Sequence, residues 1–294
     1  MFYLLFGKYL CEKNLLSKNA INEANHTVSD SRLRLGLIAV AEGLLSTDQA
    51  EEVHRLQAIK DKRFGDIAVE KGFLTNTQVE HLLSMQGNTY LKFVQALVDA
   101  KLMTLEEINA WLSAYQRDKG YTDDQMNKLK KSDVDDILDI VLSIDNPLYK
   151  NLMSLAIRNL VRFIDRNVCV DGCYKTDNYK FQSLAIQNAT GDHNILLGFS
   201  GSEAGLIKLA STYADEDFTE MDADSYDAIC EFINCINGLY ASKLSTEDVM
   251  IDMLPPNFYT KQTIKSTGLV VVPVTFSEYS IDLIVSIDAP IEFQ

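Results

Sequence analysis

The chain has 294 residues, enough for two domains of ordinary size, and its 47% hydrophobic and 23% charged residues are typical of a soluble globular protein. That balance excludes collagen-like, low-complexity and disordered chains. The 27 basic and 42 acidic side chains give a net charge of −15, which excludes binding of a nucleic-acid backbone through bulk electrostatics.

A repeat with a step of 29 residues occupies residues 1–117. Its four copies align at Phe6-Gly7, Leu35-Gly36, Phe64-Gly65 and Phe93-Val94. Each copy predicts two short helices joined tightly, and in the middle copies Gly43 and Gly72 suit the left-handed residue at a helix end. Capping boxes that start at Ser46, Thr75 and Thr104 predict the beginnings of the second helices. One such pair cannot bury its apolar face alone, so we expect the copies to stack into an α-helical repeat domain.

The two middle copies share further positions. Residues 34–57 and 63–86 each begin with Arg, any residue and Gly, continue through a second Gly, and end with Gln. This tandem arrangement resembles the MshEN domain found at the N-terminus of type II secretion and type IV pilus ATPases, some of which bind cyclic di-GMP. The resemblance implies candidate nucleotide contacts at Arg34, Gly36, Arg63 and Gly65. The alternative is that the repeats serve packing or the docking of a partner protein.

Residues 118–145 are highly polar and predict a linker with a short amphipathic helix near 138–142. Charge also changes here: residues 1–117 carry 13 basic and 14 acidic side chains, whereas residues 118–294 carry 14 and 28. We therefore expect two units with different partners, with a second domain over 146–294.

The second part alternates helix and strand signals. Asn146 as N-cap and Pro147 at the first helical position predict a helix over 147–167. Strands are predicted at 181–189 and 193–199, followed by a helix at 202–213 and a longer helix at 224–244 with Asp224 as its N-cap. Two β-branched runs, 267–276 and 281–287, predict the last strands. This order indicates an α+β domain with helices packed on an antiparallel sheet.

Cysteines and histidines show no metal-binding spacing. None of the five cysteines forms a C-x-x-C pair, so reduced and mostly buried thiols are expected. The apolar start lacks a basic n-region, and no run of about 18 apolar residues follows. We therefore expect a cytoplasmic protein without a bound metal or membrane insertion.

The helix predicted at 224–244 presents a polar row opposite its apolar stripe. At about 100° per residue, Asp227, Glu231, Asn234 and Gly238 fall on one side of the helix. A surface helix with polar residues opposite its core stripe is common. The spacing of these four residues, with Pro255 and Pro256 following, nevertheless resembles the signature of the CheC/CheX/FliY phosphatases. The resemblance covers residues 147–294 and implies a CheC-like fold.

Only one signature helix is present, since the helix at 147–167 offers Ser154, Arg158 and Val161 in the same slots. The chain is therefore most similar to CheX. The resemblance implies hydrolysis of the aspartyl phosphate of a CheY-like receiver domain, whose own Mg²⁺ would serve the reaction. It assigns Glu231 and Asn234 as catalytic and Asp227 and Gly238 as auxiliary docking residues. Asn234 would orient the attacking water, and Glu231 would pair with a basic group of the receiver.

Two other functions stay open. The domain could bind a receiver or dimerise without turnover, or the chain could be a repeat-based adaptor of secretion or pilus machinery. The CheX resemblance also implies a homodimer formed through exposed strand edges of the C-terminal hairpin.

Overall fold

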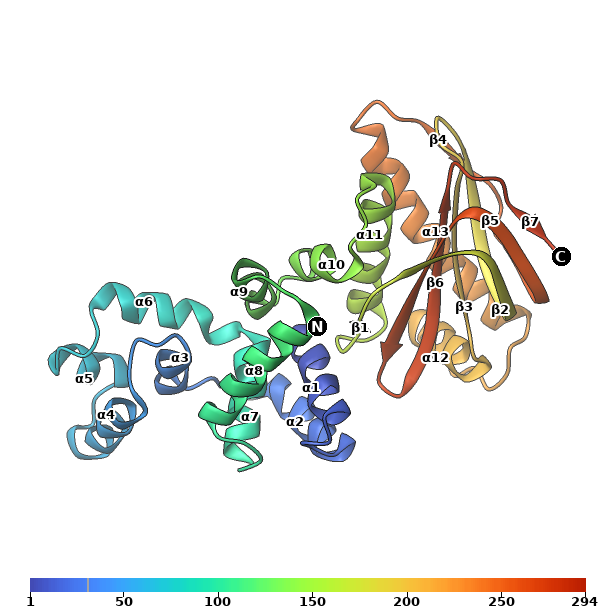
Figure 1. The fold of residues 1–294 in the computed structure, drawn as a ribbon. Helices are drawn as coiled ribbons and strands as arrows, with labels where there is room; N and C mark the ends of the chain where they lie inside the picture. The colour runs from blue at the N-terminus through green and yellow to red at the C-terminus, as the bar shows by residue number, and fades with distance from the viewer. Residues whose placement is uncertain (31) are drawn as a thin grey trace. The chain divides into compact units, whose positions relative to one another are not determined.

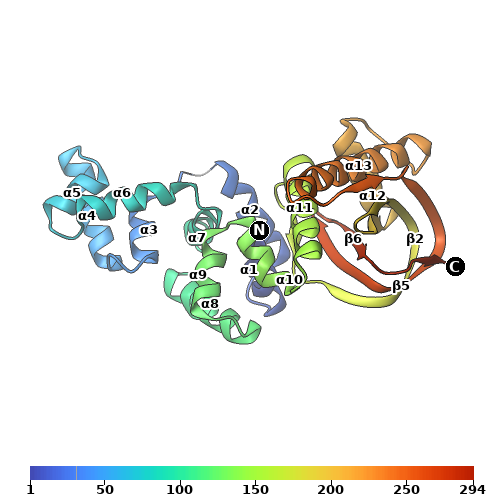
Figure 2. The same cartoon turned by 90° about the horizontal axis from the view of Figure 1, so that it is seen from above.

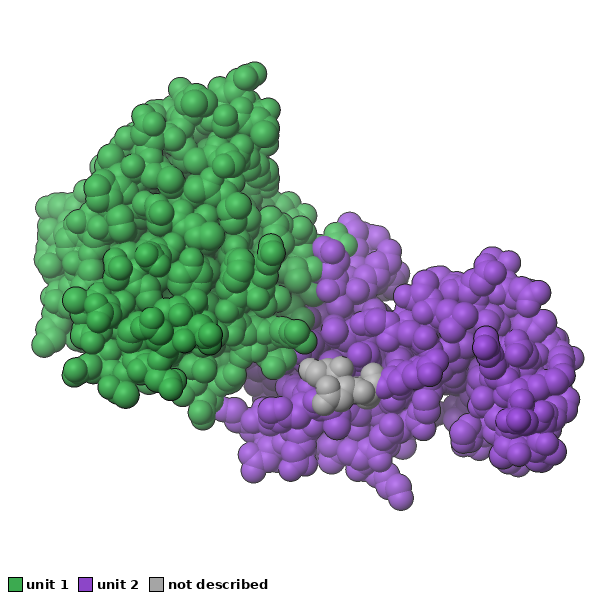
Figure 3. All heavy atoms as spheres, turned by 180° about the vertical axis from the view of Figure 1, so that it is seen from behind, with its two compact units in different colours: residues 1, 134–294 green, residues 2–133 purple. Residues whose placement is uncertain are grey.

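The computed structural model describes residues 1–30 and 32–294, which divide into two compact units (Figure 3). One unit comprises residues 2–133, and the other comprises residues 134–294 together with residue 1. The division falls within the polar stretch 118–145, which holds α9 (Asp123–Lys131) and α10 (Val134–Leu142). The connecting helix predicted near 138–142 is thus the first helix of the unit of residues 134–294. This unit, green in Figure 3, is called the second unit below because it follows the helical unit in the chain.

The unit of residues 2–133 is helical (Figure 1). Before α9 it contains α1 (Phe2–Glu12), α2 (Lys18–Asp30), α3 (Leu35–Ala41), α4 (Thr47–Lys60), α5 (Phe64–Glu70), α6 (Asn76–Ser84), the 3₁₀ turn η1 (Met85–Gly87), α7 (Thr89–Asp99) and α8 (Leu105–Lys119). The second helices of the four repeats begin at residues 18, 47, 76 and 105, which confirms the 29-residue step. The three predicted capping boxes are present, and Gly43 and Gly72 have φ angles of +68° and +70°.

The repeat glycine has a packing role within the first and third repeats. A Cβ on Gly65 would lie 2.6 Å from Val79 Cγ1, and a Cβ on Gly7 would lie 3.0 Å from Ile21 Cγ2. Ile21 and Val79 occupy the same position of their repeats, two steps of 29 residues apart. Because a side chain has no room at this crossing, glycine lets the two helices of a repeat approach closely.

The second unit has the predicted α+β architecture. After α10 it contains α11 (Pro147–Phe163), β1 (Cys169–Val170), β2 (Tyr174–Gly191), β3 (Ile195–Gly201), α12 (Glu203–Ala214), α13 (Ala223–Ser245), β4 (Ile251–Met253), β5 (Asn257–Phe276), β6 (Tyr279–Ile287) and β7 (Glu292–Phe293). Asn146 caps α11 as predicted, because its side chain accepts a hydrogen bond from the backbone N–H of Leu148 at 2.9 Å. The helix ends at Phe163, four residues before the predicted end.

The strands form one antiparallel sheet in the order β1-β5-β6-β3-β2-β4, with an additional pairing between β5 and β2. This pairing runs from Tyr174 opposite Val271 to Ile186 opposite Asn257, so β2, β3, β6 and β5 make a closed circuit. Figure 2 shows the long strands curving round as the circuit requires. Apolar side chains from these strands pack as one cluster: Phe181, Leu184, Ile186, Leu196, Ile264, Leu269 and Ile284.

Three helices pack against the sheet and position the candidate site. α13 contacts β2 and β3, α12 contacts β3 and β6, and α11 contacts β6. The ring of Phe232 on α13 stacks on Phe199 of β3 with centroids 5.6 Å apart. The hydroxyl of Tyr240, near the C-terminal end of α13, donates to the carbonyl of Leu148 on α11 at 3.0 Å. These contacts hold the inner face of α13 against β3 and α11, and the opposite face of the helix carries the candidate site.

The C-terminal hairpin does not offer the free edge on which the dimer prediction depended. β6 pairs with β5 on one side and with β3 on the other. Homodimerisation stays a prediction, and a dimer formed edge to edge would have to use another strand.

Candidate functional site on helix α13

The helix α13 begins two residues earlier than its sequence suggests. Its N-cap is Asp222, whose carboxylate accepts the backbone N–H of Ser225 at 3.0 Å while the Ser225 hydroxyl accepts the backbone N–H of Asp222 at 2.8 Å. The prediction of Asp224 as N-cap is therefore wrong. A reciprocal capping box satisfies two free amides, whereas Asp224 at that place would leave the Ser225 hydroxyl unused.

The four residues of the predicted row lie along the outer side of α13. Asp227, Glu231 and Asn234 are exposed, and Gly238 is half-buried. Within the described part of the chain, neither carboxylate has a hydrogen bond or an ion pair with another residue. The two acids are thus free to meet groups of an incoming molecule.

Gly238 has no packing role of its own. The nearest atom to a Cβ built there is Met253 Cε at 3.9 Å, an ordinary contact distance. Glycine inside a helix costs about 0.5–1 kcal/mol relative to alanine. Because packing within the unit does not require a glycine here, the open surface at Gly238 is available to a partner. Met253 and Leu254 beside it are 41% and 42% exposed, which adds apolar area to this surface.

A buried amide on the sheet supports Asn234 from below. Gln187 lies in the C-terminal part of β2 and is 1% exposed. Its Nε2 donates to Oδ1 of Asn234 at 2.8 Å and to the carbonyl of Leu254 at 3.0 Å, and its Oε1 accepts from Nδ2 of Asn237 at 2.9 Å. Both hydrogens of the Gln187 amide are therefore used.

Sequence reasoning did not identify Gln187 or Asn237. The available signal was a glutamine within the predicted strand 181–189, directly after the apolar residues 184–186, because an amide that such a strand buries needs partners. The strand sequence does not indicate that the partners are Asn234 and Asn237, since they lie 47 and 50 positions further along the chain.

The loop after β4 is tied to the same strand. The backbone N–H of Leu254 donates to the carbonyl of Asn188 at 2.9 Å, and the Leu254 carbonyl accepts the Gln187 bond. Pro255 follows directly, and a residue before proline is restricted to extended conformations. Pro255 and Pro256 thus directly follow Leu254, whose carbonyl accepts a hydrogen bond from the amide that also binds Asn234.

The thiol of Cys230, which precedes Glu231 in the sequence, is not a nucleophile at neutral pH. Burial, together with a smaller contribution from the negative charge of Asp227, raises the pKa of Cys230 to about 11. A thiol with this pKa stays protonated, and thiolate is the reactive form. Cys230 is therefore not a candidate nucleophile at this face of α13.

The helix α11 offers no second site. Ser154 and Arg158, which occupy the equivalent slots, both bind the carboxylate of Asp135 on α10. The third slot holds Val161, which is apolar. The resulting ion pair and its serine partner fill the place where a second acid and amide would stand.

The candidate nucleotide contacts lie in the helical unit. Arg34 and Arg63 occupy the N-cap positions of α3 and α5. Arg34 forms an ion pair with Asp99, and its backbone N–H donates to Oε1 of Gln95 at 2.8 Å. Gly65 is explained by its contact with Val79, and a Cβ on Gly36 would meet the edge of the Phe64 ring at 3.0 Å. The resemblance to MshEN stays a prediction.

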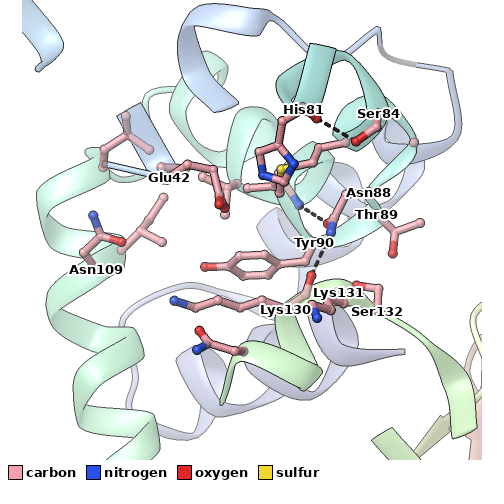
Figure 4. A pocket seen from close by; sticks show the side chains of 18 residues that line it. Glu42, His81, Ser84, Asn88, Thr89, Tyr90, Asn109, Lys130, Lys131 and Ser132 are labelled. Atoms are coloured by element: carbon pink, nitrogen blue, oxygen red, sulfur yellow. Dashed lines mark hydrogen bonds between the residues drawn. The ribbon is translucent and has the colours of Figure 1, made fainter. Parts of the chain in front are cut away.

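A pocket of about 500 Å³ lies elsewhere in the helical unit, between α6, α7, α8 and α9. Figure 4 shows Tyr90 and Lys130 among the residues that line it, together with Glu42, His81 and Asn109. Neither Arg34 nor Arg63 is among its lining residues. The pocket and the candidate nucleotide contacts are therefore separate features.

Residues 1–30 and 32–294 contain neither a metal-binding cluster nor a membrane-spanning helix. No group of three or more His, Cys, Asp or Glu side chains in these ranges is placed to hold a metal ion. None of the described helices combines the length and apolar character needed to cross a membrane.

Comparison with known proteins places residues 183–275 in the family described as chemotaxis phosphatase CheX. No curated protein matches the chain. Among solved structures, CheX from Desulfovibrio desulfuricans aligns at 16% identity with a TM-score of 0.42, covering 48% of this chain and 99% of its own. CheX from Vibrio vulnificus aligns at 11% identity with a TM-score of 0.43 and the same coverage. A CheX–CheY–BeF₃–Mg²⁺ complex from Borrelia burgdorferi aligns at 15% identity and 0.39, covering 48% and 97%.

The family match includes all of the residues that build the site. It spans Gln187 on β2, the row from Asp227 to Gly238 on α13, and Leu254 with the prolines that follow. Residues 183–275 of this chain are therefore a CheX domain.

Proposed function

We propose that the second unit hydrolyses the aspartyl phosphate of a CheY-like receiver domain. The observation that carries the proposal is the pairing of an exposed acid and an exposed, internally anchored amide, Glu231 and Asn234, one turn apart within a CheX domain. Phosphoryl transfer depends on positioning and charge stabilisation more than on covalent catalysis. A surface helix that inserts two polar side chains into the receiver's site meets that requirement.

Each residue of the row has a distinct task in this proposal. The Asn234 amide orients the attacking water in line with the phosphorus. Glu231 pairs with a basic group of the receiver and thereby sets the depth at which the amide enters. Asp227 orients the start of the helix against the partner, and Gly238 lets the receiver backbone approach. The receiver supplies its own Mg²⁺, so this chain needs none.

The test is release of phosphate from Mg²⁺-loaded phosphorylated receivers of the same organism, with binding measured in parallel. Asn234→Ala should lower the rate by a factor of about 10² or more, as the loss of other positioning groups does. It should cost about 1 kcal/mol in stability, because the Gln187 amide loses one hydrogen-bond acceptor. Ser242→Ala, on the same helix, should change neither quantity. Equal turnover by wild type and Asn234→Ala would remove the catalytic assignment.

The same assay separates the alternatives. Binding of a receiver without turnover would favour a non-enzymatic CheX-like module. If no receiver binds and pilus or secretion proteins are captured instead, the chain acts as a repeat-based adaptor.

A further inference from the structure

We infer that Gln187 is a positioning residue that fixes which atom of the Asn234 amide faces the receiver. This inference rests on the proposed function, since it concerns the water that Asn234 would orient. It comes from the geometry of the buried amides rather than from the row itself.

The orientation of the network follows from a single fixed acceptor. A backbone carbonyl can only accept a hydrogen bond, so the group that lies 3.0 Å from the Leu254 oxygen must be the NH₂ of Gln187. The same nitrogen lies 2.8 Å from the Asn234 side chain, and its second hydrogen needs an acceptor there. Asn234 must therefore turn Oδ1 towards Gln187 and Nδ2 towards solvent.

The other end of Gln187 confirms this arrangement. Its Oε1 needs a donor, and Nδ2 of Asn237 lies 2.9 Å away. Asn237 is 2% exposed, so it is held by the packing of α13 on the sheet. Reversing the Gln187 amide would set two oxygens against each other at Leu254 and two nitrogens against each other at Asn237. One orientation of the amide satisfies all of its partners.

The fixed orientation of Asn234 determines which of its hydrogen-bonding groups can hold the reacting water. The Asn234 oxygen has two lone pairs, of which Gln187 occupies one, so one lone pair and both Nδ2 hydrogens stay available at the surface. An exposed asparagine normally rotates among several orientations. Anchored by Gln187, Asn234 presents one fixed pattern, which lowers the entropy lost when a water is held in line.

The direct test measures turnover and receiver binding for wild type, Gln187→Met, Asn234→Ala and the double variant. Gln187→Met keeps the length of the side chain and removes both the donors and the acceptor. It should lower kcat about tenfold or more, with receiver binding unchanged within about twofold. In the Asn234→Ala background the same change should lower kcat no further, because the group through which Gln187 acts is absent. An equal loss in both backgrounds would overturn the inference.

A second readout does not depend on turnover. Relaxation of the ¹⁵N-labelled side-chain amide of Asn234 should show restricted motion in the wild type and free rotation in Gln187→Met. The exposed amide of Asn76, which has no hydrogen bond with a described residue, serves as the mobile reference. Ile284→Val, which loosens the core of the same unit, should leave the Asn234 amide restricted. A wild-type Asn234 amide as mobile as that of Asn76 would overturn the inference, whereas a restricted amide without turnover of any receiver would instead count against the proposed function.

Discussion

The backbone of Gly65 lies so close to Val79 that a Cβ at this position would be 2.6 Å from the Val79 Cγ1 atom. Gly65→Ala should therefore lower the free energy of unfolding of the helical unit by about 1–3 kcal/mol, the usual cost of overpacking. Unfolding in urea can be followed by the fluorescence of Trp111, because this single tryptophan lies on α8 in the helical unit. Gly87→Ala is the matched control, since a Cβ at Gly87 would meet nothing within 4 Å. Equal midpoints for the two variants would contradict the packing role of the repeat glycine.

Calorimetry of the full chain with cyclic di-GMP tests the resemblance of the middle repeats to MshEN. If these repeats bind the nucleotide, Arg34→Ala and Arg63→Ala should each weaken binding by about 1–3 kcal/mol, the value of a bidentate contact to a guanine edge. Lys130→Ala, in the separate pocket, is the control and should leave this binding unchanged. Absence of heat at millimolar nucleotide would assign the repeats to packing or partner docking.

Gly238→Ala separates the needs of the fold from those of the partner. Alanine should stabilise α13 by about 0.5–1 kcal/mol, because the new methyl group meets only Met253 Cε at a normal contact distance. If the receiver covers this surface, the same methyl group should weaken receiver binding. Thermal unfolding and receiver titration of one preparation provide both measurements. Greater stability with unchanged receiver binding would show that the partner does not reach Gly238.

Local patterns in the sequence predicted most of the helical architecture. The 29-residue offset predicted the helix pairs, and the Ser or Thr to Gln or Glu spacing predicted where the second helices begin. The strands β2 and β5 were predicted too short, at 181–189 and 267–276. Their earlier halves pair mainly with each other and carry many exposed polar side chains, so they lack the apolar signal of a strand.

For the candidate site, too, local relationships were predictable from the sequence and tertiary contacts were not. Helical periodicity predicted that Asp227, Glu231 and Asn234 share one face of α13, because that relationship is local. It could not predict that Gln187 anchors Asn234, since this contact joins a strand to a helix through tertiary packing. Periodicity alone therefore shows which face of α13 carries Asn234 and not the hydrogen bond that this side chain makes with Gln187.

Glu231 gives the sharpest test of how the receiver docks. Its carboxylate is exposed on α13 and has no ion pair with a described residue, so the proposed basic partner must come from the receiver. Glu231→Gln keeps the shape and removes the charge, and it should weaken receiver binding about tenfold to a hundredfold, or about 1.5–3 kcal/mol. The salt dependence of binding should become flatter, since one attractive charge pair is lost. Glu278→Gln, on the exposed β5–β6 turn, changes the net charge equally and should leave affinity and salt dependence unchanged. Matching losses in both variants would mean that overall charge, and not a pair at Glu231, brings the receiver to α13.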